Sequence, residues 1–96
     1  MEIKPSTNLI KTNKNYDGNQ LITLFFEING FIKTEISCKL NELFKDVIKR
    51  VLNQNGISEN NNILVIYKAQ KMELNVPIGE YHFQNWDIIT IIICDI

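Results

Sequence analysis

The chain has 96 residues, which is the length of one small domain. A domain of this size buries only about 60–65% of the surface that its unfolded chain exposes, so it has a modest core and little room for a deep catalytic cleft. Ten lysine and arginine residues stand against eleven aspartate and glutamate residues, for a formal net charge of −1. This balance excludes a strong field of one sign, so we expect no nucleic-acid partner and no membrane partner.

The N-terminal residues lack the features of a targeting signal. Residues 1–10 carry neither the apolar core of a secretory signal nor the arginines of a mitochondrial presequence. The longest apolar stretch, residues 88–94, is far shorter than the roughly 20 residues that a helix needs to span a bilayer. We expect an intracellular protein, in the cytoplasm or in a cytoplasmic or cytoskeletal assembly, with an organelle as the open alternative. Cys38 and Cys94 are expected to be unpaired thiols, because a reducing compartment disfavours a disulfide.

Residues 1–20 are predicted to form a polar N-terminal tail, and residues 21–96 the folded domain. The segment 6–20 is rich in Asn, Lys and Thr and shows no apolar period, so it cannot offset the entropy that it would lose on ordering. A polar tail of this kind is rarely ordered when it is free, so we expect a partner to hold it wherever it is ordered.

Two strands are predicted over residues 21–28 and 31–38, joined by an Asn-Gly turn. Both segments are rich in β-branched and aromatic residues, and both turn residues tolerate a positive φ. A two-residue turn would place Phe26 opposite a lysine, whereas a register one step further pairs Phe26 with Ile32. The second register is chemically better, and it predicts a longer or bulged loop with Gly30 in the left-handed conformation. The predicted core face of this hairpin consists of Ile22, Leu24, Phe26, Ile32 and Ile36.

An amphipathic helix is predicted between Asn41 and Gly56. Apolar residues recur there with a 3.6-residue period, and polar residues take the opposite side. The apolar positions are Leu43, Phe44, Val47, Ile48, Val51 and Leu52. Asn41 is the predicted N-cap, because its side chain can accept a hydrogen bond from a free backbone N–H, and Gly56 is the predicted terminator. Asp46 precedes Arg50 by four residues, a spacing at which an ion pair adds a few tenths of a kcal/mol.

Short apolar segments separated by turns complete the domain. Strands are predicted over residues 63–67 and 88–94, with a short apolar strand at 72–74 between them. The order of elements is therefore β-β-α-β-β-β. The last segment is apolar on both sides, so it belongs at the centre of a mixed sheet, beside the first strand. With the helix packed across one face of that sheet, this is an α+β fold of the β-grasp type, and we expect Phe44 and Val51 to pack on the closing strand.

The chain resembles the ubiquitin-like family over residues 21–94. The matching features follow one another in chain order: an opening hairpin, a helix that ends at Gly56-Ile57, a strand at 64–67, the segment 78–83 and a closing isoleucine-rich strand. The resemblance implies that the Tyr81 hydroxyl ties down the loop before it, and that Ile28 is the rough counterpart of a leucine at the hairpin tip. The sequence ends Cys-Asp-Ile at residues 94–96, without the Gly-Gly tail of conjugated members, so we expect neither thioesters nor conjugates.

The alternation of side chains along the last strand predicts an apolar surface on the sheet face away from the helix. If the odd-numbered residues of 88–94 face the helix, the intervening residues face outward. The predicted protein-binding residues on this outer face are Phe25, Leu64, Ile66, Ile88, Thr90 and Ile92. The resemblance implies the same face, because it places the family's central recognition isoleucine at Ile66 and two flanking positions at Thr90 and Ile92. A protein partner, a second copy of the chain or the tail of residues 1–20 would cover a face this apolar.

Trp86, directly before the last strand, is predicted either as a lid on the core or as an exposed anchor for a partner. No residue is predicted to be catalytic, to bind a metal or to hold a cofactor, because His82 is the single histidine and has no second ligand or base. We expect a non-catalytic, non-conjugated interaction module, a structural or adaptor subunit of a multi-subunit protein assembly. Two alternatives stay open: a modifier or carrier with a differently processed terminus, and an adaptor that reads charge through Lys33 and Lys39.

Overall fold

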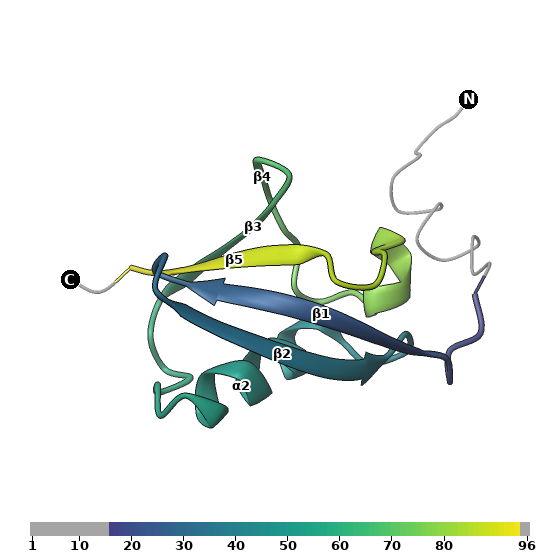
Figure 1. Cartoon of the computed structure of the whole chain (residues 1–96), viewed down its shortest axis with the longest axis horizontal. Coiled ribbons are helices and arrows are strands. Elements are labelled where there is room, and N and C mark those ends of the chain that lie inside the picture. The colour runs from purple at the N-terminus through teal and green to yellow at the C-terminus, as the bar shows by residue number, and fades with distance from the viewer. Residues whose placement is uncertain (1–15, 95–96) are drawn as a thin grey trace.

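The computed structural model describes residues 16–94. Along this range the elements are β1 Leu21–Ile28, β2 Ile32–Lys39, α2 Phe44–Gln54, β3 Ile63–Tyr67, β4 Gln70–Lys71, the 3-10 helix η1 Ile78–Tyr81 and β5 Ile88–Ile93. One sheet holds the strands in the order β2-β1-β5-β3-β4 (Figure 1). Because β5 runs parallel to β1 and antiparallel to β3, the closing strand lies at the centre, and the predicted α+β β-grasp arrangement is confirmed.

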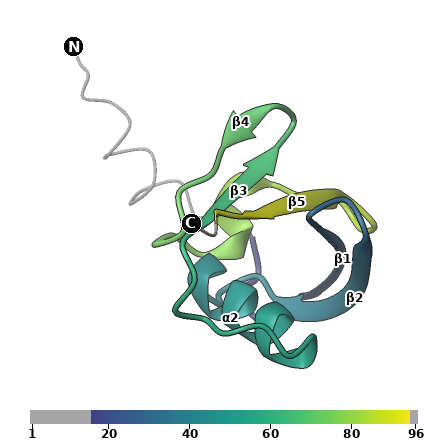
Figure 2. The same ribbon diagram turned by 90° about the vertical axis from the view of Figure 1, so that its left-hand side faces the viewer.

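The core lies between α2 and one face of the curved sheet (Figure 2). The apolar stripe of α2 is buried as its period predicts, and it shares one cluster with β1 and β5. The fully buried large side chains of this cluster include Leu24, Phe26, Phe44, Val47, Val51, Ile89 and Ile91. The expected packing of Phe44 and Val51 against the closing strand agrees with their joint burial, and Phe44 also meets the rings of Tyr81 and Phe83 edge-on.

The register of the β1–β2 hairpin differs from the predicted one by two residues. Ile28 pairs with Ile32 and Phe26 with Thr34, across a three-residue loop that ends at Phe31. Gly30 has φ +80, as predicted. Because the side chains of a strand alternate with a period of two, a two-residue shift keeps every side chain on its expected face. It moves Ile32 to the end of the ladder, however, where it is 38% exposed, so its assignment to the core is wrong.

The cause of this register lies outside the hairpin. The backbone N–H of Asn29 donates to the Ile91 carbonyl at 2.9 Å, and the Asn29 side chain accepts a hydrogen bond from the Ile93 N–H at 2.9 Å. These bonds hold the turn against the end of β5, so the hairpin ladder reaches as far as Ile28. Ile28 and Cys38 then take core positions that the sequence does not assign to them.

The helix begins at Phe44, three residues after the predicted cap. Leu43 is the N-cap residue and makes no side-chain capping bond. The first N–H groups of α2 are satisfied by backbone instead, because Phe44 donates to the Val76 carbonyl and Lys45 to the Leu74 carbonyl, both at 2.9 Å. The prediction of Asn41 as N-cap is therefore wrong.

The end of α2 and its surface charges settle two smaller predictions. Gly56 follows the last turn with φ +70, so its role as terminator is confirmed. Arg50 does not pair with Asp46, since its guanidinium reaches Glu42 at 3.2 Å and lies 3.3 Å from the Ser37 carbonyl.

The segment between β4 and β5 is held by hydrogen bonds rather than by regular strand structure. The apolar strand expected at 72–74 is wrong: β4 consists of Gln70–Lys71, and the chain beyond it turns toward the N-terminus of α2. The hydroxyl of Tyr81 donates to the Glu73 carbonyl at 2.6 Å, which is the loop-tying role that the resemblance implies. Burial raises the pKa of Tyr81, so its hydroxyl stays protonated as a donor at neutral pH.

Residues 16–20 pack on the domain, although they belong to the predicted tail. The Asn41 N–H donates to the Gly18 carbonyl at 3.0 Å, and the Tyr16 hydroxyl donates to Glu80 at 3.3 Å. The Tyr16 ring lies so close to Gly79 that a Cβ added there would be 2.4 Å from it. Residues 1–15 lie outside the described residues, so the assignment of a tail remains a prediction for them.

Candidate interaction surface

The candidate site is the face of the sheet that α2 does not cover (Figure 2). The exposure of β5 alternates along this strand, because Ile89 and Ile91 are fully buried while Ile88 is 60% and Ile92 37% exposed. The predicted alternation is therefore confirmed. A strand that is apolar on both sides has only one side packed against the core.

The register of the sheet brings the predicted outer-face residues next to one another. Ile88 of β5 lies opposite Phe25 of β1, and on the other side of β5 Thr90 lies opposite Ile66 and Ile92 opposite Leu64. Phe25, Leu64, Ile66 and Thr90 are all half-buried. Three strands thus contribute to one continuous surface, as the sequence predicts.

A polar row divides this surface into two apolar parts. Thr90 lies beside Glu27 of β1, which in turn lies beside Lys33 of β2. On one side of the row lies an aromatic cluster, made of Phe25, Trp86 and Ile88. On the other side lie Ile92 and Leu64, and together with Ile66, which lies opposite Thr90 at the end of the row, they form an aliphatic cluster. The sequence predicts the members of the surface but not this division.

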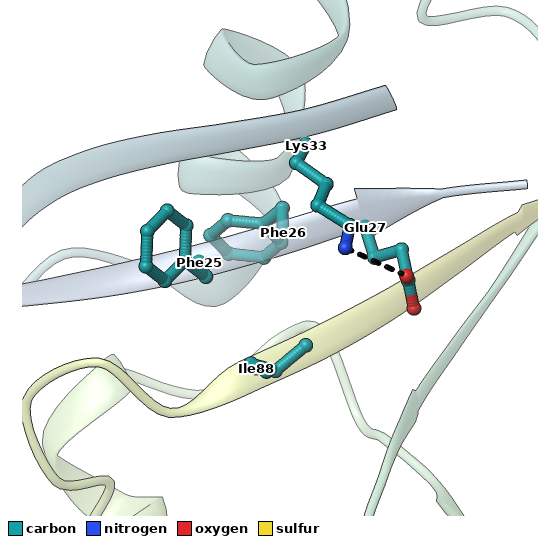
Figure 3. Close-up of a pocket in the computed structure, with 5 residues that line it drawn as sticks. All are labelled: Phe25, Phe26, Glu27, Lys33 and Ile88. Atoms are coloured by element: carbon teal, nitrogen blue, oxygen red, sulfur yellow. Dashed lines mark ion pairs between the residues drawn. The ribbon is translucent and has the colours of Figure 1, made fainter. Parts of the chain in front are cut away.

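The aromatic cluster borders a shallow hollow of about 280 Å³ on the outer face (Figure 3). Its lining comes from Phe25, Phe26, Glu27, Lys33 and Ile88. Lys33 reaches from β2 toward Glu27, with 3.8 Å between its ammonium nitrogen and the carboxylate, and its side chain is 69% exposed. An exposed ion pair of this length adds little to stability.

Trp86 lies beside Phe25 in the aromatic cluster. Its ring centroid lies 5.6 Å from that of Phe25. The residue is 54% exposed, so the predicted lid on the core is wrong, and the exposed anchor is the alternative that stays open. The Trp86 N–H donates to the Thr23 carbonyl at 2.7 Å, and the Thr23 N–H donates to the Asn85 side chain at 2.9 Å. The backbone of Trp86 is thereby held at φ +72, a left-handed conformation that bulky residues rarely adopt.

Asp87 fixes the turn that carries Trp86. Its carboxylate accepts hydrogen bonds from the Gln84 N–H at 2.8 Å and from the Tyr67 hydroxyl at 2.5 Å. Burial, together with this bond to Asp87, raises the pKa of Tyr67 to about 12. The turn is consequently tied both to β1, through Thr23, and to β3, through Tyr67.

Phe31 is an exposed residue that the sequence reasoning missed. It lies at the tip of the β1–β2 hairpin and is 88% exposed, whereas Ile28, the implied counterpart of a tip leucine, is 1% exposed. The role assigned to Ile28 is therefore wrong. Starting the return strand at residue 32 instead of residue 31 would have placed Phe31 at the tip.

The reactive side chains of the described range are dispersed. Among residues 16–94, no three His, Cys, Asp or Glu side chains gather closely enough to hold a metal ion. Cys38 and Cys94 are both free thiols, as expected. Burial raises the pKa of the Cys38 thiol to about 11, so it is protonated at neutral pH and a poor nucleophile. None of the helices in this range combines the length and apolar character needed to cross a membrane.

Comparisons with solved structures agree on the fold. A structure described as molecular mimicry of SUMO that promotes DNA repair superposes with a TM-score of 0.68 at 19% identity, over 82% of this chain and 96% of its own. The ubiquitin of Caldiarchaeum subterraneum superposes with a TM-score of 0.70 at 11% identity, over 80% of this chain and 98% of its own. A designed protein based on ubiquitin gives a TM-score of 0.65 at 13% identity, over 74% of this chain and 85% of its own.

The chain therefore has a ubiquitin-like β-grasp fold, as the sequence predicts. No protein-family profile and no curated protein sequence matches the chain.

Proposed function

We propose that the chain is a non-catalytic protein-interaction module, a small structural or adaptor subunit that docks to another protein through the outer face of its sheet. The docking surface consists of the predicted residues Phe25, Leu64, Ile66, Trp86, Ile88, Thr90 and Ile92. The observation that carries this proposal is the exposure of Ile88 and Ile92 on the central strand. In a free domain, a strand with one face in water usually carries polar side chains on that face.

The energetics favour a partner on this face. Covering apolar surface contributes roughly 25 cal/mol for each Å² removed from water, and α2 supplies this on the opposite side of the sheet. Exposed apolar patches bordered by polar groups are typical of protein-binding sites. Aromatic residues such as Trp86 and Phe25 often contribute most of the binding energy of an interface. A protein fits better than a nucleic acid, because the formal net charge is −1 and no basic field is present.

The double substitution Ile66→Asp, Ile92→Asp tests the docking surface. The full chain, tagged and expressed in its own cells, is purified with its bound proteins and compared with this variant. Ile32→Asp is the matched control, because Ile32 is 38% and Ile92 37% exposed, but Ile32 lies on the opposite sheet face. We expect at least a tenfold loss of the bound proteins from the double variant alone, because two uncompensated charges would be buried at the contact.

Three results would contradict the proposal. Equal recovery from the double variant would place the partner on another face. A dimer of the isolated chain in sedimentation, abolished by the double substitution, would assign the face to a second copy. Binding of a hydrophobic dye after removal of residues 1–15, together with lost stability of the isolated double variant, would assign it to the tail.

A further inference from the structure

The aromatic cluster lies beside a carboxylate that has no partner within residues 16–94. Phe25 pairs with Ile88 on one side and with Glu35 of β2 on the other, so Glu35 shares the outer face with the two rings. The Glu35 side chain is exposed and takes part in no ion pair or hydrogen bond among residues 16–94. Lys33, the nearest cation on β2, is already paired with Glu27. The cluster therefore combines exposed ring surface with an unmatched negative charge.

We propose that the aromatic cluster and Glu35 form a subsite for an arginine side chain of the protein partner, with a large apolar side chain of the same partner in the adjoining hollow. This inference rests on the proposed function and specifies what the partner presents at one end of the docking surface. A guanidinium is planar and weakly hydrated, so it stacks on Trp86 or Phe25 while donating two parallel hydrogen bonds to a carboxylate. A lysine ammonium has neither a flat face for stacking nor two parallel N–H groups in one plane.

The open shape of the hollow agrees with a side chain rather than a small-molecule ligand. Its volume is about 280 Å³. Pockets for drug-sized ligands usually measure about 300–1,000 Å³ and enclose most of the ligand, whereas this hollow lies open on the sheet face. The lining residues Phe25 and Ile88 fit an apolar side chain that enters the hollow.

A second copy of the chain is a poor occupant of this subsite. Arg50 is the chain's only arginine. Its guanidinium pairs with Glu42 at 3.2 Å and lies 3.3 Å from the Ser37 carbonyl, so a second copy would have to give up these contacts to present it. These contacts favour a guanidinium from a chain of different sequence.

The backbone of Trp86 indicates that its ring is not there for stability. A left-handed conformation is unfavourable for a tryptophan and natural for a glycine, and backbone strain of this kind concentrates at functional sites. The turn that contains Trp86 is held by Thr23 and Tyr67 through bonds that a glycine at position 86 would leave intact. Glycine would give a better turn, but it would remove the ring from the surface.

A display selection tests the subsite while the partner is still unidentified. Random dodecapeptides on phage are selected on the full wild-type chain, and the recovered peptides are titrated against Trp86→Gly, Glu35→Lys and the control Glu73→Lys. Glu73 is also exposed, and only its backbone carbonyl is used by Tyr81, so the control makes the same charge change elsewhere. We expect arginine next to a large apolar residue in the recovered set. We also expect at least tenfold weaker Kd values for Trp86→Gly and Glu35→Lys, less than twofold change for Glu73→Lys, and a Trp86→Gly melting temperature no lower than that of the wild type.

The outcomes separate this inference from the proposed function. Recovery of no peptide, of peptides without arginine, or of peptides that bind Trp86→Gly and Glu35→Lys like the wild type would overturn the subsite. Peptides that lose binding to the double variant Ile66→Asp, Ile92→Asp but not to Trp86→Gly would overturn the subsite and leave the docking surface standing. A Trp86→Gly chain that melts well below the wild type would assign Trp86 a structural role and contradict the argument from its backbone.

Discussion

The two faces of β5 have nearly the same composition and opposite environments. Ile89 and Ile91 have no exposed surface, while Ile88 and Ile92, their direct neighbours in the chain, are 60% and 37% exposed. Composition therefore does not tell the two faces apart; the difference comes from α2, which covers one face of the sheet (Figure 2). The comparison teaches that the inner isoleucines stabilise the fold, whereas the outer ones are exposed and accessible to the docking role proposed above.

Removing the largest side chain of α2 would break the inner face most severely. Phe44 has no exposed surface and contacts the rings of Tyr81 and Phe83. Phe44→Ala should lower the free energy of unfolding by about 3–5 kcal/mol, because it removes buried surface and leaves a cavity. Urea denaturation measures this effect. An unchanged midpoint would mean that α2 does not pack on the sheet as described.

A matched pair of truncations compares the two faces within one strand. Ile91→Ala should cost about 2–5 kcal/mol, because Ile91 is fully buried. Ile92→Ala should cost less, about 1 kcal/mol in the isolated chain, because more than a third of this residue is already exposed to water. Both values come from urea unfolding of the two variants under one set of conditions. Equal losses would contradict the assignment of separate roles to the two faces.

Tyr81→Phe tests a bond that supports the helix side. The substitution removes the hydrogen bond of 2.6 Å to the Glu73 carbonyl and keeps the ring against Phe44. We expect a loss of about 0.5–1.5 kcal/mol in the free energy of unfolding. Thermal melts of the two proteins measure it, and a variant as stable as the wild type would show that water replaces the bond without loss.

The smallest expected effect concerns the turn under the aromatic cluster and depends on pH. The folded pKa of Tyr67 is raised from 10.0 to about 12, first by burial and then by Asp87. The stability that the Tyr67 hydroxyl contributes is therefore complete below the pKa of this residue in the unfolded chain. It is lost as the pH rises through the pKa of the residue in the folded chain. The stability difference between wild type and Tyr67→Phe should shrink between pH 10 and pH 12, as urea midpoints would record. A difference that stays constant over this range would contradict the bond to Asp87.

Elements that depend on local pattern were predictable from the sequence. The period of the helix and the alternation of β5 assign Phe44, Val51, Ile89 and Ile91 to the core, and both follow from neighbouring residues alone. The same alternation places Ile88 and Ile92 on the outer face.

Features that depend on distant backbone partners were not predictable. The hairpin register is set by bonds between Asn29 and β5, and the start of α2 by the carbonyls of Leu74 and Val76. The exposure of Trp86 depends on Thr23, 63 positions earlier in the chain. No short-range pattern encodes these pairs, since each joins residues that meet only after the sheet has formed.

Methyl cross-saturation of isoleucine-labelled chain, in complex with the protein it co-purifies with, tests the central claim most directly. The isoleucines of β3 and β5 report on both faces in one spectrum. We expect the methyl groups of Ile66, Ile88 and Ile92 to lose intensity when the partner is irradiated, and those of Ile89 and Ile91 to keep it. Unaffected signals from Ile66, Ile88 and Ile92, with losses confined to isoleucines elsewhere such as Ile32 or Ile57, would contradict the assignment of the outer face as the docking surface.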